Sequence, residues 1–126
     1  MKRQEIGASD VAPATGYAHG VELAGATRFL FLSGQVPVTV AGTVPAGIEA
    51  QTRKVWDNLL AHLAAAGMSA DNLVKITVFL SDQRNRSAVN TVSDEILAGR
   101  MVAWTTVIAG LVRDDWLLEI EAIAAA

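Results

Sequence analysis

The chain has no cysteine and little charge. Its 126 residues contain no Cys, which excludes disulfides, thiolate metal ligands and cysteine nucleophiles. Only 18% of the residues are charged, against about 25% in typical soluble domains, whereas 52% are hydrophobic. So few polar side chains do not comfortably cover a small monomer, and we therefore expect apolar surface to be buried between subunits.

Long apolar runs and concentrated positive charge are also missing. Charged residues interrupt every apolar stretch before it reaches the roughly 18 residues that span a bilayer, so no membrane association is expected. No apolar segment follows the basic N-terminus, and we expect no secretory signal. The net charge is −3 and the basic residues are scattered, which disfavours a nucleic-acid partner. These absences predict a cytoplasmic protein, and its length, without a repeat or linker, predicts a single domain, residues 1–126.

Apolar periodicity predicts an α+β fold in the order β-β-α-β-α-β-β. Strands interrupted by two helices favour a mixed sheet with both helices packed on one face. The expected elements are a hairpin of strands 21–24 and 28–33, a helix over 46–66 ended by Gly67, a strand over 72–80, a second helix between Asp82 and Gly99, and strands 103–111 and 117–124 around a turn at 113–115.

The strand that contains Phe29-Leu30-Phe31-Leu32 is apolar on both faces. A sheet with helices on one side leaves its other face uncovered, and no remaining part of this chain is available to cover it. This conflict strengthens the expectation that the protein is an oligomer.

Five segments form a specific pattern: residues 31–37 (FLSGQVP), 51–54 with 58–59, 65–67, 74–80 and 119–124. Their order and spacing closely resemble the RidA/YjgF family, the reactive intermediate deaminases, from about Ala12 to the C-terminus. The resemblance implies a chorismate-mutase-like fold and a homotrimer with a central barrel-like core, in which a small-molecule ligand binds in clefts at the subunit interfaces. It also implies hydrolysis of imines and enamines to ketones and ammonia without a metal or organic cofactor.

The resemblance assigns candidate site residues one by one. Tyr17 stands where the family has the cleft tyrosine of a Gly-Pro-Tyr element, although the proline is absent here. Ser33 and Gly34 match a cleft-facing Ser-Gly pair. Asn90 matches a helix asparagine, and Glu119 matches the glutamate that holds the attacking water.

One position departs from the family. Deaminating members have Pro-Ala-Arg-Ser where this chain has Val102-Ala103-Trp104-Thr105, and their arginine pairs with the substrate carboxylate. An indole offers one N–H and an apolar plane instead of a guanidinium fork. We therefore expect weak activity on small 2-imino acids. We also expect Trp104 to form a cleft wall that selects flat, apolar or aromatic ligands, beside the hydroxyls of Thr105 and Thr106.

Structural explanations remain open for several of these residues. Trp104 could belong to the core, which is the usual place of a strand tryptophan. Tyr17 could be a packing aromatic, and Asn90 could hold the corner between strand and helix. His19 could relay protons if residues 17–19 are extended, because it would then share a face with Tyr17. A lone histidine is more often structural.

Neither a replacement for the missing arginine nor a metal site is evident from the sequence. Three arginines, Arg84, Arg86 and Arg100, could supply positive charge from another direction, but their spacing does not distinguish them from solvated surface charges. The chain has only two histidines, His19 and His62, on separate elements, and no metal site is predicted.

Three functions remain. The first is an enzyme of altered specificity, in which Glu119, Tyr17 and His19 transfer protons or activate water on a larger reactive intermediate. The alternative is a non-catalytic trimer that binds a small metabolite in its interface clefts. The acidic balance and the lack of a basic, aromatic groove disfavour the third, an RNA-directed activity sometimes attached to this family. We predict the first.

Overall fold

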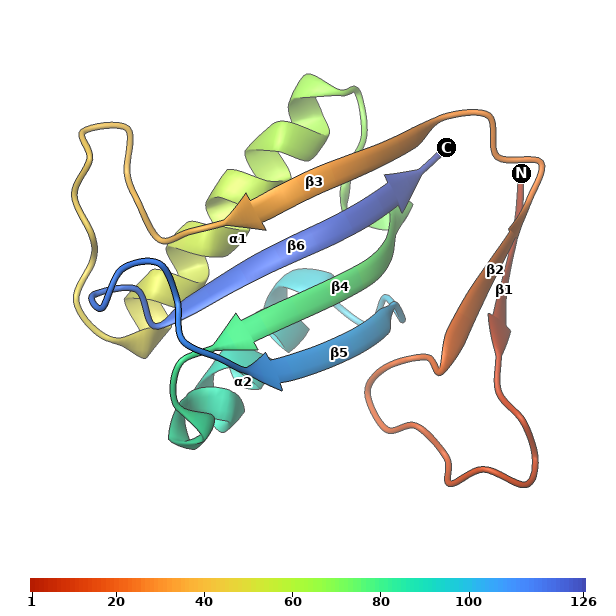
Figure 1. The fold of residues 1–126 in the computed structure, drawn as a ribbon. Helices are drawn as coiled ribbons and strands as arrows, with labels where there is room; N and C mark the ends of the chain where they lie inside the picture. The colour runs from red at the N-terminus through yellow and green to blue at the C-terminus, as the bar shows by residue number, and fades with distance from the viewer.

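The computed structural model describes all of residues 1–126, and its main element is a mixed four-stranded sheet (Figure 1). The strand order is β3-β6-β4-β5, in which β4 and β5 are parallel and the other neighbours antiparallel. Both α-helices cover the same face of this sheet. The prediction of an α+β fold with two helices on one face is confirmed. The bounds are β3 (Phe29–Gln35), α1 (Ile48–Ala65), β4 (Leu73–Leu80), α2 (Arg86–Leu97), β5 (Ala103–Ile108) and β6 (Leu118–Ala125).

The two helices lie where their apolar periodicity and stop signals predict them. Buried residues of α1 recur at three- and four-residue steps, and the chain leaves the helix at Gly67, whose φ of 70° is left-handed. A short 3-10 helix, Gln83–Asn85, precedes α2 and is capped by the Asp82 side chain. The end of α2 is marked by Gly99, with a φ of 84°. Local turn chemistry therefore sets both helix lengths.

The core lies between the helices and one face of the sheet. Alternate residues of β4 and β6 are fully or nearly fully buried on this face, and Trp56 and Leu59 of α1 pack against them. The Trp56 indole N–H donates to the Ser93 hydroxyl of α2 at 2.9 Å. This buried hydrogen bond joins the two helices without an unsatisfied polar group.

The predicted hairpin of residues 21–24 and 28–33 is wrong. β2 (Gly20–Ala24) pairs instead with β1 (Lys2–Ile6), a strand that the sequence did not indicate because its residues are polar or charged except for Ile6. After Gly25, which has a φ of 80°, the backbone N–H groups of Thr27 and Arg28 donate to the Ala126 carbonyl, and the chain enters β3 beside β6. The β1–β2 ribbon stands beside the four-stranded sheet (Figure 1).

The last two strands are present, but they are not neighbours in the sheet. β5 and β6 form near the expected ranges, but they do not pair with each other, because β6 lies between β3 and β4. A strand near the C-terminus therefore occupies the centre of the sheet, where its alternate residues complete the core. Neither helix is long and apolar enough to cross a membrane.

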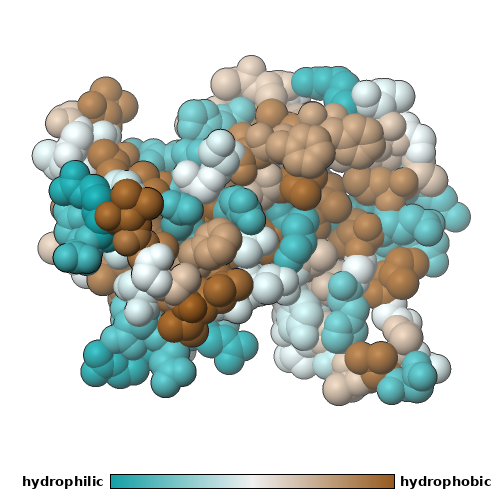
Figure 2. Space-filling model, viewed as in Figure 1, coloured by the Kyte–Doolittle hydropathy of each residue, from teal (hydrophilic) through white to brown (hydrophobic).

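The other face of the sheet, which we call the open face, has no helix over it. Phe29, Phe31 and Val107 on this face are 58%, 73% and 38% exposed. Figure 2, a space-filling view from the same side as Figure 1, shows apolar patches on this side of the molecule interspersed with polar side chains. The apolar character of both faces of β3, expected from the sequence, is thus present in the structure, with one face uncovered.

Candidate functional site

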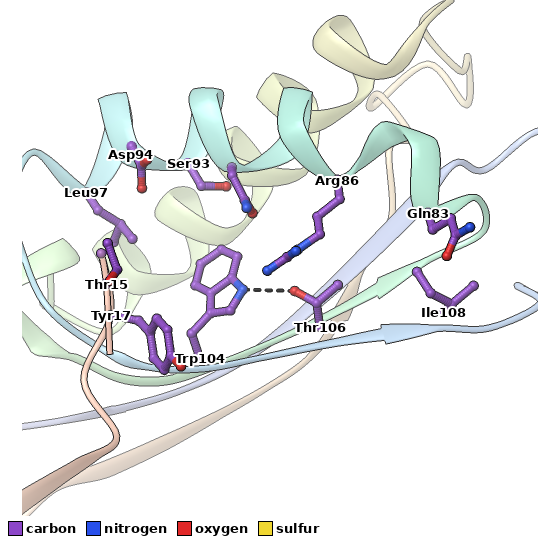
Figure 3. Close-up of a pocket in the computed structure, with 12 residues that line it drawn as sticks. Thr15, Tyr17, Gln83, Arg86, Ser93, Asp94, Leu97, Trp104, Thr106 and Ile108 are labelled. Carbon is purple, nitrogen blue, oxygen red and sulfur yellow. Dashed lines mark hydrogen bonds between the residues drawn. The ribbon is translucent and has the colours of Figure 1, made fainter. Parts of the chain in front are cut away.

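A cleft of about 400 Å³ lies between α2 and the edge strand β5 (Figure 3). Side chains on one face of α2, at steps of three and four residues, line it together with alternate residues of β5 and the end of the loop before β2. The lining residues are Thr15, Gly16 and Tyr17 from the loop, Gln83 from the 3-10 helix, Arg86, Asn90, Ser93, Asp94 and Leu97 from α2, and Trp104, Thr106 and Ile108 from β5.

Trp104 is a wall of this cleft and also packs against the core. Its side chain is half-buried and points toward α2. The indole N–H donates to the Thr106 hydroxyl at 3.0 Å, so the polar edge of the ring is already satisfied within β5 (Figure 3). Trp104 therefore presents an apolar surface to the cleft, and it lies both against the core and in the cleft wall.

Tyr17 and Asn90 supply two of the unpaired polar groups of the cleft. The residue after Tyr17 is held beside the start of β5 by a hydrogen bond from the Ala18 N–H to the Val102 carbonyl at 2.9 Å. Gly16 has a φ of 79°, which a residue with a side chain rarely adopts. The Tyr17 hydroxyl and the Asn90 amide have no hydrogen-bond partner within the chain, and both can serve a ligand.

His19 is not brought into this cleft. Its ring lies edge-on to Tyr17, with ring centroids 5.7 Å apart, and its Nε2 is 2.7 Å from the Ala12 carbonyl. A carbonyl only accepts, so this contact requires Nε2 to carry the proton. His19 therefore joins the two ends of the loop over residues 12–19 by a hydrogen bond and packs against the ring of Tyr17.

Glu119, Ser33 and Gly34 lie together on β6 and β3, away from the cleft. The β3–β6 register shifts between Leu32 and Gln35, which places a bulge at Ser33 and Gly34. A Cβ on Gly34 would stand 2.4 Å from Glu119 Oε2, so only glycine leaves room for this carboxylate. Glu119 is half-buried and its carboxylate has no partner within the chain. Free carboxylate oxygens in such a place can hold or deprotonate a water.

Thr105 faces the open face rather than the cleft, because successive strand residues alternate. Its hydroxyl accepts a hydrogen bond from Lys75 Nζ at 2.7 Å. Burial lowers the pKa of Lys75, and the charge of Glu121 opposes this shift. Lys75 is a polar feature of the open face that the sequence did not single out, since a lysine in a strand is usually solvated.

The nine predicted site residues thus fall into three places. Four share the cleft: Tyr17, Asn90, Trp104 and Thr106. Four lie on β3, β5 and β6 outside the cleft: Ser33, Gly34, Thr105 and Glu119. The ninth, His19, contacts the Tyr17 ring from outside the cleft. No single copy of the chain assembles them all into one site.

Sequence reasoning missed one charged residue of the cleft, Asp94, and did not distinguish another, Arg86, from Arg84 and Arg100. Each lies four residues from Asn90 on α2, and this spacing was the available signal. No three His, Asp or Glu side chains lie close enough together to hold a metal ion.

Comparisons with known proteins agree with this architecture. The family described as Endoribonuclease L-PSP matches residues 7–126. The chain is 38% identical to "Protein mmf2, mitochondrial" of Schizosaccharomyces pombe over 99% of both chains. It is 35% identical to the 2-iminobutanoate/2-iminopropanoate deaminase of Escherichia coli, over 93% of this chain and 94% of that one. The cytoplasmic location expected from the sequence stays a prediction, since the yeast relative is named as mitochondrial.

A solved structure agrees as well. The crystal structure of Escherichia coli TdcF with bound serine matches with a TM-score of 0.75 at 32% identity, over 98% of both chains. The relative named "Putative reactive intermediate deaminase TdcF", of Escherichia coli, is 34% identical over 86% of this chain and 84% of that one. The segments that form the FLSGQVP strand, the two helices and the C-terminal strand are therefore those of a known family: the chain belongs to the RidA family, described as Endoribonuclease L-PSP.

Proposed function

We propose that this protein hydrolyses reactive imine or enamine intermediates at a site that two copies of the chain build together. The observation that carries the proposal is the Glu119 carboxylate, which lies unpaired over the side-chain-free Gly34. The cleft beside Trp104 holds binding groups, and its one carboxylate is that of Asp94. A neighbouring copy that brings its Glu119 to the open cleft supplies the missing base.

The open face supports assembly into a homotrimer with a barrel-like centre. Phe29 and Phe31 are large apolar residues, more than half exposed, on a face that no element of the chain covers. Apolar area of this kind is usually buried against a partner. Three sheets that close around their open faces would bury these residues and bring the β5 cleft of one copy toward β3 and β6 of the next.

The chemistry needs only a base, a hydrogen-bond donor and water. Water adds to the carbon of the C=N bond while the Glu119 carboxylate takes one of its protons. The tetrahedral intermediate then collapses: the nitrogen takes up that proton and the proton of the new hydroxyl group, the C–N bond breaks to release ammonia, and the C=O bond of the ketone forms. Imine and water are thereby converted to ketone and ammonia. The Tyr17 hydroxyl donates to the polar end of the substrate, and His19 acts only by holding Tyr17.

Trp104 alters the specificity in this proposal. Its apolar plane occupies the position at which the family's arginine binds the substrate carboxylate, and its N–H is used by Thr106. A small 2-imino acid makes little contact with such a wall, whereas a flat or aromatic side chain can stack on it. We therefore expect imines from aromatic amino acids to be better substrates than iminopropionate.

The test compares two carboxylates on the same strand face. Imines are generated in situ from phenylalanine or alanine by an amino acid oxidase, and their removal is followed in competition with semicarbazide. We expect Glu119→Gln to lower the rate about 100-fold or more with ligand binding retained, and Glu121→Gln to leave it nearly unchanged. Equal effects of the two variants contradict the role of Glu119. A parent protein that binds ligand but removes no imine is instead a non-catalytic metabolite binder.

A further inference from the structure

Arg86 differs from every other arginine in the chain. Of the seven arginines, six have a hydrogen-bond or ion-pair partner within the chain, and Arg86 alone has none. The contrast is sharpest with Arg84, two residues earlier. The Asp82 carboxylate binds the Arg84 guanidinium at 2.6 Å, and this contact lowers the pKa of Asp82 to about 2.

The free guanidinium of Arg86 lies at the cleft. Arg86 is the first residue of α2 and lines the cleft one helical turn before Asn90. Figure 3 shows its side chain extending from α2 toward Trp104 and Thr106 on β5. Arg100, beyond the opposite end of α2, is held by Asp71 and the Leu97 carbonyl. Arg86 is thus the one unpaired cation of the cleft.

Charge in the cleft is arranged along α2. Asp94 lines the same cleft two turns after Arg86, a distance of about 12 Å along the helix axis. Between them lies the apolar surface of Trp104, whose only N–H is already bonded to Thr106. An anionic group is attracted to the Arg86 end and repelled from the Asp94 end. A ligand with one carboxylate and a flat apolar body fits this order of charges.

We propose that Arg86 is the carboxylate-binding residue of this site and that the substrates are 2-imino acids with a flat or aromatic side chain. The inference rests on the proposed hydrolytic function and adds to it the residue that binds the substrate carboxylate. The guanidinium binds the carboxylate through two parallel hydrogen bonds, and the side chain of the substrate lies against Trp104. The carboxylate is thus bound by an arginine of α2. In deaminating relatives an arginine of the strand binds it, at the position where this chain has Trp104 on β5.

Binding of unreactive analogues tests this assignment apart from turnover. Calorimetric titration compares phenylacetate with phenylacetamide, which has the same ring but no charge, on the parent protein, Arg86→Gln and Arg84→Gln. We expect the parent to bind phenylacetate about tenfold or more tightly than the amide, because a hydrogen bond to a charged group adds at least that much. Arg86→Gln removes this preference, whereas Arg84→Gln, which changes the net charge equally, retains it.

Several outcomes overturn the proposal. An unchanged preference in Arg86→Gln, an equal loss in Arg84→Gln, or no saturable binding of either compound each does so. The imine assay then separates the two proposals. Loss of activity in Glu119→Gln with full activity on the phenylalanine imine in Arg86→Gln retains the hydrolytic function and removes Arg86 from it. A preference for phenylacetate that depends on Arg86, in a protein without turnover, retains the anion site and removes the hydrolysis.

Discussion

The two faces of the four-stranded sheet carry side chains from the same strands but have opposite roles. On the helix-covered face, Ile76 and Val78 are fully buried against α1 and α2. On the open face, Phe31 is 73% exposed and Lys75, Glu119 and Glu121 bring charges among apolar residues. Strand alternation alone decides which side chain goes to which face. What differs is the cover: helices on one side, and nothing from this chain on the other.

This difference explains how the candidate site is distributed. Trp104 and Thr106 belong to the covered side of β5, where the distance between α2 and the strand leaves a cleft. Thr105, between them in sequence, belongs to the open face. In the proposed function the covered face provides the ligand pocket, and the open face provides Glu119 and the apolar surface for assembly. Each face can be perturbed separately.

The largest effect is expected from a cavity in the covered face. Leu59→Ala removes a fully buried side chain at the centre of the core, and we expect the free energy of unfolding to fall by about 2–5 kcal/mol. Urea denaturation followed by circular dichroism measures the loss. Leu60→Ala, the same truncation at the half-buried next position of α1, is the control and should cost clearly less. Equal losses would show that α1 does not pack as described.

A substitution on the open face should have a smaller effect on folding but a large effect on assembly. Phe31→Ser removes an exposed ring, so the secondary structure should be retained while the protein dissociates from a trimer to monomers. Sedimentation equilibrium at micromolar concentration gives the mass. Val40→Ser, at a fully exposed apolar loop position, should remain assembled. A parent protein of monomer mass would disprove the trimer and the site shared between copies.

The smallest effect concerns the charge of Lys75 on the open face. Burial lowers its pKa in the folded chain, so the unfolded chain binds more protons between that lowered pKa and the ordinary value of about 10.4. Stability therefore rises with pH through this window. Relative to the parent, Lys75→Met should be more stable at neutral pH, and the difference should shrink as the pH approaches the ordinary lysine value.

The control for this measurement is Lys54→Met on α1, which removes the same charge from the helical side of the molecule. Its stability difference from the parent should not follow the same pH course. A difference that grows with pH for Lys75→Met would mean that the ammonium stabilises the folded chain, through Glu121 and Thr105, more than its burial destabilises it.

Local sequence signals predicted much of the fold. The helical spacing of Val55, Leu59 and Leu63 and the stop at Gly67 place α1 within two residues of its observed bounds. The apolar run of β4 and the glycine after α2 were equally informative. These signals succeed because they depend on backbone torsion and on periodic burial within one segment. The pattern around Phe31, Gln51 and Glu119 was long enough to identify the family as well.

The sequence predicted less well which strands pair and which distant segments contact one another. β1 was missed because its polar residues show no alternation, and β2 was paired with the wrong neighbour. Gln51 gave no sign that its side chain, by bonding the Pro45 and Asp115 carbonyls and accepting the Leu117 N–H, joins α1 to the segment before β6. The bond between Gln51 and Leu117 joins residues 66 positions apart, and no local propensity records a pairing of this kind.

The sequence by itself determined the fold class, the length of the helices, the family, and the presence of a tryptophan where relatives have an arginine. Only the tertiary structure decided which of three similar arginines has no partner and faces Trp104, and that Glu119 lies on another face of the sheet from the cleft. The reason is physical. Neighbouring residues decide where a helix or turn forms, whereas packing between segments far apart in the chain decides which groups surround a charged side chain.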